Sequence, residues 1–72
     1  MSNIRKKIKR DIAQAKEDIT KAQVKLAHIE VDLNVAKQSE TESGKLLIAG
    51  SKAIAGILEQ SLVLLIDIDS HV

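Results

Sequence analysis

Apolar residues recur three and four residues apart along the first half of the chain, which is the spacing of the a and d positions of a coiled coil. A stripe this narrow on a long helix cannot bury itself, so the helix must pack against another helix. This seam therefore predicts how the chain associates, but it does not identify the function of that association. Its predicted members are Ile12, Ala15, Ile19, Ala22, Leu26, Ile29 and Leu33.

The first helix is predicted to run from about residue 3 to about residue 38, with Ser2 or Asn3 as its N-cap. Large and small side chains alternate along its seam, and alanine leaves room for a facing isoleucine or leucine, which favours close, antiparallel packing. The flanking charges favour a parallel dimer instead, because three of the four g-to-e pairs are complementary. Exposed pairs contribute only about 0.2–1 kcal/mol each, so the sequence leaves the orientation open.

The segment 39–44 is the predicted turn between two helices. Ser39 and Glu42 have the spacing of a capping box, and Gly44 can adopt a positive φ without steric cost. We therefore expect a helical hairpin. The competing prediction is one continuous helix, because the chain contains no proline.

The second helix, predicted over about residues 45–65, is apolar on most of its circumference. Its thin polar line consists of Lys45, Lys52 and Glu59, seven residues apart. Such a helix is buried by several neighbours or by lipid, and the first helix can cover only one side of it. The predicted helices are about 54 Å and about 30 Å long, so the basic start of the first helix should overhang. Both features predict at least a dimer.

The tail, residues 66–72, alternates apolar and polar residues and predicts a short extended segment. In a strand, Asp67, Asp69 and His71 would share one face that can hold a divalent metal. Three polar residues at a terminus are ordinarily just solvated, so we assign no metal and no cofactor.

Composition excludes several classes of protein. The 72 residues form one domain at most, without cysteine or aromatic side chains, so disulfide-stabilised miniproteins and thiolate metal sites are excluded. The N-terminus lacks the apolar region of a signal peptide, and we expect a cytoplasmic protein. No nucleophile lies beside a plausible base, and a two-helix unit has little room for a pocket that excludes water, so we predict no enzymatic activity.

Two segments suggest other partners. The basic run Arg5, Lys6, Lys7, Lys9 and Arg10 can contact nucleic acid or another anion, although the chain has no aromatic side chain to stack on bases. The simpler interpretation is a solvated helix end, or a helix end that contacts an acidic end of another subunit. Residues 46–66 are long enough to cross a bilayer. Lys52 and Glu59 oppose insertion by about as much as the apolar residues favour it, so burial in an oligomer is preferred.

The sequence thus predicts an all-α protein, a helical hairpin with a coiled-coil-like seam that self-associates, most economically as a four-helix bundle of two chains. We expect a small, non-enzymatic interaction and assembly module, a scaffold or regulator that binds itself as a homo-oligomer and can bind a further protein. The alternatives are a nucleic-acid-associated regulator that uses the basic run, and a membrane-active peptide that inserts the second helix. The residues expected to face the first seam from the second helix are Ile54, Leu58, Leu62 and Leu65.

Overall fold

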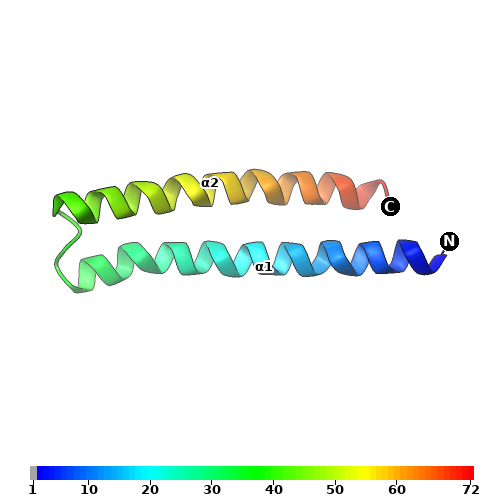
Figure 1. Ribbon diagram of the computed structural model, residues 1–72, viewed down its shortest axis with the longest axis horizontal. Helices are drawn as coiled ribbons and strands as arrows, with labels where there is room; N and C mark the ends of the chain where they lie inside the picture. Colours follow the sequence, from blue (N-terminus) through cyan, green and yellow to red (C-terminus); the bar gives the residue numbers. More distant parts are fainter. Residues whose placement is uncertain (1) are drawn as a thin grey trace.

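A computed structural model describes residues 2–72 as two antiparallel helices joined by a short loop (Figure 1). Helix α1 spans Ser2–Val35 and helix α2 spans Glu42–Ser70. The molecule measures 55 × 16 × 12 Å and its radius of gyration is 16.5 Å, whereas a compact chain of this length has about 11 Å. The predicted helical hairpin is confirmed, and the competing prediction of one continuous helix is wrong.

Helix α1 ends in a Schellman motif. The N–H of Gln38 donates to the carbonyl of Leu33 at 2.8 Å, and the N–H of Lys37 donates to the carbonyl of Asn34 at 3.1 Å. Lys37 has a φ of 58°, in the left-handed region that glycine occupies without steric cost. The helix therefore stops at Val35, before the predicted residue 38, and the residue with positive φ is Lys37 and not Gly44.

Thr41 caps helix α2. Its hydroxyl accepts a hydrogen bond from the N–H of Gly44 at 3.0 Å and donates one to the carbonyl of Gln38 at 2.7 Å. The capping box predicted from Ser39 and Glu42 is wrong, because residues 38–41 are held in the loop and the extended N-cap conformation falls on Thr41. The helix consequently begins at Glu42, before the predicted residue 45.

Gly44 is buried where the first turn of α2 meets the loop. A Cβ at this position would overlap the carbonyl oxygen of Gln38 and would lie 2.9 Å from the hydroxyl oxygen of Thr41. The position therefore needs glycine for a close approach of two backbone segments and not for a positive φ.

The predicted extended tail is helical. Helix α2 continues to Ser70, and the N–H of His71 donates to the carbonyl of Ile68 at 3.0 Å. A lone strand here would leave its backbone groups without partners, whereas a helix satisfies them internally. The longer α2 reaches Asp69, which pairs with Lys9 at 3.7 Å, so the large predicted overhang of α1 is reduced to its first turns (Figure 1).

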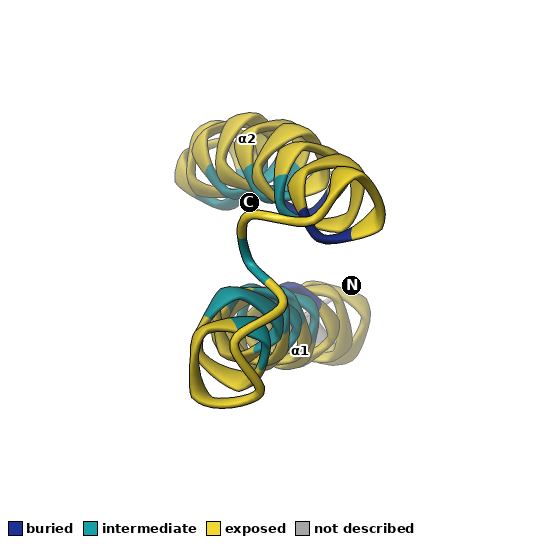
Figure 2. Cartoon of the chain, turned by 90° about the vertical axis from the view of Figure 1, so that its left-hand side faces the viewer, coloured by how far each residue is buried: buried dark blue, intermediate teal, exposed yellow. Residues whose placement is uncertain are grey.

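The core is a single strip between the helices (Figure 2). In α1, the buried and half-buried apolar side chains are the predicted members of its seam, which we call the α1 seam. Among the described side chains, Ile12 is the only buried apolar one, at 6% exposure. In α2, the buried and half-buried positions other than Ser61 follow the same three-and-four spacing, and we call them the inner seam: Gly44, Ile48, Ser51, Ala55, Leu58, Leu62, Leu65 and Asp69.

Candidate self-association interface

Polar contacts along one edge of the hairpin set the register of the two helices. The ammonium of Lys52 lies 3.7 Å from the carboxylate of Glu30, and the amide of Gln23 donates to the carboxylate of Glu59 at 3.1 Å. The predicted polar line of α2 therefore runs beside the inner seam, where Lys52 and Glu59 reach polar groups of α1. The rest of the circumference of α2 carries few charges.

Large and small side chains face one another across this register. The inner-seam residues Gly44, Ser51 and Ala55 lie in the half of α2 beside the large C-terminal residues of the α1 seam. In the other half, the alanines of the α1 seam lie beside the leucines of α2. The alternation that predicted close antiparallel packing is thus used within the chain.

The predicted seam residues of α2 divide between two faces. Leu58, Leu62 and Leu65 are half-buried toward α1, as predicted. Ile54 is 50% exposed and lies on a different face, so the prediction that it faces the α1 seam is wrong. Ile48 takes an inner-seam position that sequence reasoning missed. Counting back from Leu58 in steps of three and four residues would have found it, but the small residues in between concealed the series.

A second series on α2, which we call the outer seam, has the same spacing and is exposed except at the half-buried Ser61. It is the inner seam shifted by one residue, so it lies about 100° around the helix. Its five large apolar members are 50–64% exposed. Each seam of this kind can pack against one neighbouring helix, and α1 covers only the inner one. The outer seam consists of Leu47, Gly50, Ile54, Ile57, Ser61, Leu64 and Ile68.

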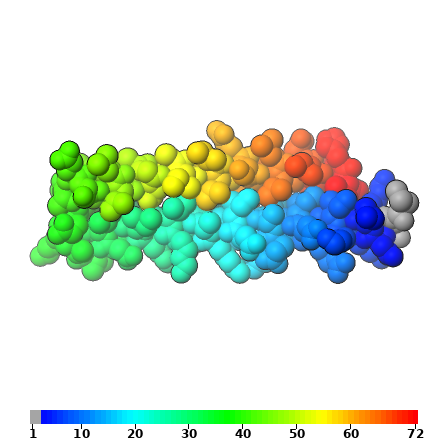
Figure 3. Space-filling view, in the orientation of Figure 1, coloured from blue at the N-terminus to red at the C-terminus, as the bar shows by residue number. Residues whose placement is uncertain are grey.

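The total exposed surface shows how incomplete the burial is. The two helices touch along their length but form only a single layer (Figure 3). The accessible surface is 5614 Å², whereas a compact monomer of this mass exposes about 4,400 Å². The surplus of about 1,200 Å² exceeds the roughly 800 Å² that each partner buries in a standard protein interface.

The five residues of the predicted basic run are all exposed at the open end of the hairpin. Two of them are paired, Lys7 with Asp11 at 3.2 Å and Lys9 with Asp69 at 3.7 Å. The other three have no ion-pair partner within residues 2–72. Exposed pairs of this kind contribute little to stability, so the main property of this end is its positive charge.

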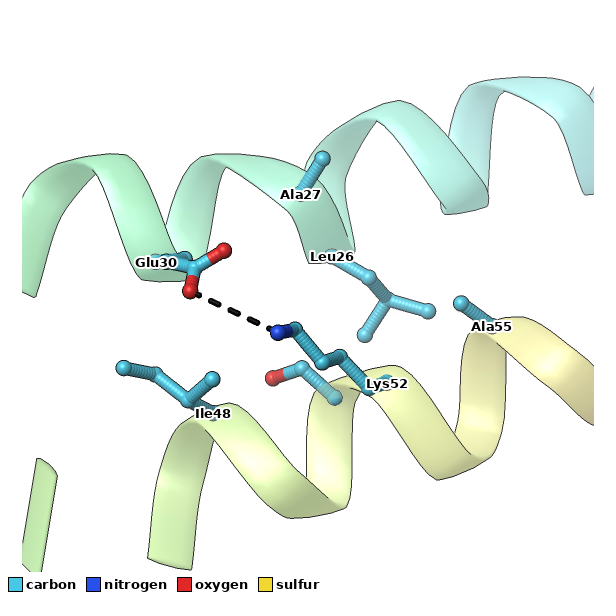
Figure 4. Close-up of a pocket in the computed structure, with 7 residues that line it drawn as sticks. Leu26, Ala27, Glu30, Ile48, Lys52 and Ala55 are labelled. Carbon is cyan, nitrogen blue, oxygen red and sulfur yellow. Dashed lines mark ion pairs between the residues drawn. The ribbon is translucent and has the colours of Figure 1, made fainter. Parts of the chain in front are cut away.

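A small pocket of about 140 Å³ opens between the helices at Lys52, whose ammonium points toward the carboxylate of Glu30 (Figure 4). Ligand-binding pockets usually have volumes of about 300–1,000 Å³, so this one is too small to hold a typical substrate. Small side chains at Ala27, Ser51 and Ala55 leave the space unfilled. The other residues that line it are Leu26 and Ile48.

The strand on which Asp67, Asp69 and His71 would share one face does not form, because α2 continues to Ser70 and His71 is its C-cap. Asp67 and His71 lie 4.0 Å apart along one side of α2, while Asp69 turns to Lys9. Within residues 2–72, no group of three potential metal ligands comes together.

Helix α2 is also the one described helix whose length and apolar composition fit a membrane span. Core helices of soluble proteins pass the same test, although little of this helix is buried in the hairpin. Its exposed apolar side chains therefore fit either a protein partner or lipid.

Comparison with known proteins gives no match among family models, curated proteins or solved structures. Function is therefore inferred from the surfaces of the hairpin itself.

Proposed function

We propose that this chain is a small, non-enzymatic assembly module that acts by binding a second copy of itself through the outer seam of α2. The observation that carries the proposal is the row of large apolar side chains that the hairpin leaves 50–64% exposed. Exposed apolar rows of this length mark interaction sites in soluble proteins, because water contact with them is unfavourable.

The placement of the charges supports a protein partner over lipid. Lys52 and Glu59 contact polar groups of α1. If α2 entered a bilayer as part of the hairpin, the charged helix α1 would therefore enter with it. Placing both helices in a bilayer would desolvate many charges of α1, at a cost of about 2.5–3.5 kcal/mol for each charge near the bilayer centre. A second copy covers the outer seam without that cost.

The test is sedimentation equilibrium of the purified chain without detergent, in low and in high salt. We expect one discrete oligomer whose mass does not change with salt, because apolar burial holds it together. A monomer at all concentrations would contradict the proposal. An aggregate that becomes monodisperse only in detergent would replace it with the membrane role.

A matched pair of variants locates the interface. Ile57 on α2 and Val31 on α1 are both more than half exposed, at 64% and 54%. Ile57→Lys should dissociate the oligomer, because it places a charge in the outer seam, while Val31→Lys should leave its mass unchanged. An unchanged mass for Ile57→Lys would show that the outer seam is not the interface.

The basic run gives the test for the competing nucleic-acid role. The double variant Lys6→Glu with Lys9→Glu should leave the oligomer intact. DNA or RNA that is retained by the wild type and lost from this variant would favour a nucleic-acid-associated regulator in place of an assembly module.

A further inference from the structure

We propose that two copies pack α2 against α2 in an antiparallel arrangement, with a two-fold axis at Ile57. This inference rests on the proposed function, because it specifies how the outer seam is occupied. A two-fold interface uses the same surface on both copies, so the surface must be complementary to itself.

The outer seam is complementary to its own reverse. When the seam is followed in opposite directions from Ile57, a small residue on one copy meets a large residue on the other. The outermost pair is the exception and joins two large side chains. Outward from Ile57, the pairs are Ile54 with Ser61, Gly50 with Leu64, and Leu47 with Ile68.

A parallel arrangement matches the same residues poorly. Each outer-seam position would then meet itself, so Gly50 would face Gly50 and Ser61 would face Ser61. These small pairs would leave gaps between otherwise large side chains, and unfilled space in an interface costs packing energy. The inner seam already follows the antiparallel solution, with Leu26 and Ala55 lining the same small pocket.

Charge favours the antiparallel orientation independently of side-chain size. The pair between Lys9 and Asp69 sets the level of α1 beside α2, and the axis at Ile57 sets the level of the partner. Together they bring the basic first turns of one copy to the level of the partner's loop, an end that is close to neutral because Glu40 and Glu42 lie there together with Lys37 and Lys45. In a parallel dimer the two basic ends would lie together and repel each other.

Because the chain has no cysteine, single introduced cysteines report the orientation directly. A disulfide needs Cβ atoms about 3.5–4.5 Å apart. In the antiparallel dimer, two copies of Leu47→Cys place their thiols at opposite ends of the interface, whereas Leu47→Cys mixed with Ile68→Cys places them together. We expect a cross-linked dimer under mild oxidation only from the mixture.

Two glycine variants test the side-chain match. Gly50 and Gly56 both have open space where a Cβ would be, so either site accepts a larger side chain in the hairpin. Gly50→Leu would meet Leu64 of the partner subunit and should raise the dimer dissociation constant about tenfold or more. Gly56→Leu lies off the outer seam and should leave the dissociation constant nearly unchanged.

The outcomes separate the two levels of the proposal. A wild-type monomer in sedimentation would overturn the proposed function and this arrangement together. A dimer in which Leu47→Cys cross-links to itself would overturn only the antiparallel arrangement. A dimer that Gly50→Leu and Gly56→Leu weaken equally would overturn the axis at Ile57.

Discussion

The two helices differ in how much the hairpin completes them. Helix α1 has one main apolar seam, and α2 covers it from Ile12 to Leu33. The exposed large apolar residues of α1 are Ile4 and Ile8 near its start and a sparser row of three valines, Val24, Val31 and Val35. Helix α2 has two seams about 100° apart, and α1 covers only the one with the smaller side chains. The outer seam, which has more large apolar residues, is the one that the hairpin leaves exposed. Within the hairpin, α1 is therefore covered along its main seam, whereas α2 is covered along only one of its two seams, and the proposed dimer would cover the other.

The largest effect should come from breaking the α1 seam. Leu26→Asp places a carboxylate in the strip between the helices and should destabilise the fold by more than about 3 kcal/mol, enough to unfold so small a chain. Val24→Asp introduces the same charge two residues away, at a side chain that is 50% exposed, and should have little effect. Far-ultraviolet circular dichroism compares the two, and a folded Leu26→Asp monomer would contradict the architecture.

The join between the helices should be nearly as sensitive. Gly44→Ala forces a Cβ against the carbonyl oxygen of Gln38, and this backbone atom cannot move away as the end of a flexible side chain can. We expect a loss of about 2 kcal/mol, measured by urea denaturation. Gly56→Ala is the control: its Cβ meets nothing within 4 Å, so it should stabilise α2 by about 0.5–1 kcal/mol. Equal effects from both variants would remove the proposed role of the close approach.

The dependence of thermal stability on protein concentration tests whether α2 needs a second neighbour. Because the hairpin buries so little, its stability should depend on association, and the midpoint of thermal unfolding should rise by about 4 °C for each tenfold increase in protein concentration. Calorimetry at several concentrations measures this directly. A midpoint that does not change with concentration would mean that α2 is complete with α1 alone.

A smaller loss of folding stability is expected when the N-cap of α2 is removed. Thr41→Val keeps the shape of the side chain but removes the hydroxyl that accepts from the N–H of Gly44 and donates to the carbonyl of Gln38, at a cost of about 1–2 kcal/mol. Ser39→Ala alters the residue that sequence spacing favoured as the cap and should cost a few tenths of a kcal/mol. The reverse order in chemical denaturation would restore Ser39 as the cap.

The smallest effect should be a gain at the end of α1. Lys37→Gly relieves the steric cost of a side chain at φ 58° but raises the entropy of the unfolded chain. We expect a net stabilisation of about 0.5–1 kcal/mol in thermal unfolding. Lys37→Ala keeps the Cβ and should give no such gain.

Part of the fold could be predicted from the sequence. The features that could not be predicted depend on small side chains, on hydrogen bonds at the helix ends and on contact between the helices. The α1 seam was predictable because large apolar residues mark it, and the polar segment 39–44 with Gly44 predicted the turn of the hairpin. The inner seam was concealed because Gly44, Ser51 and Ala55 contribute spacing but little hydrophobicity. The helix ends were missed because hydrogen bonds of Lys37 and Thr41 decide them, and several residues in the loop can form such bonds. Helical structure in the tail depends on continuation of α2 beside α1, which alternation in seven residues does not reveal.

The hairpin places the first and last described residues at the same end of a body 55 Å long (Figure 1). In the antiparallel dimer, the chain ends of one copy would therefore emerge at one pole and those of the other copy at the opposite pole. Any domains joined to these ends would be held apart by the length of the helices. Such a dimer would act as a rigid spacer, whose span is set by the number of helical turns and not by the strength of its binding.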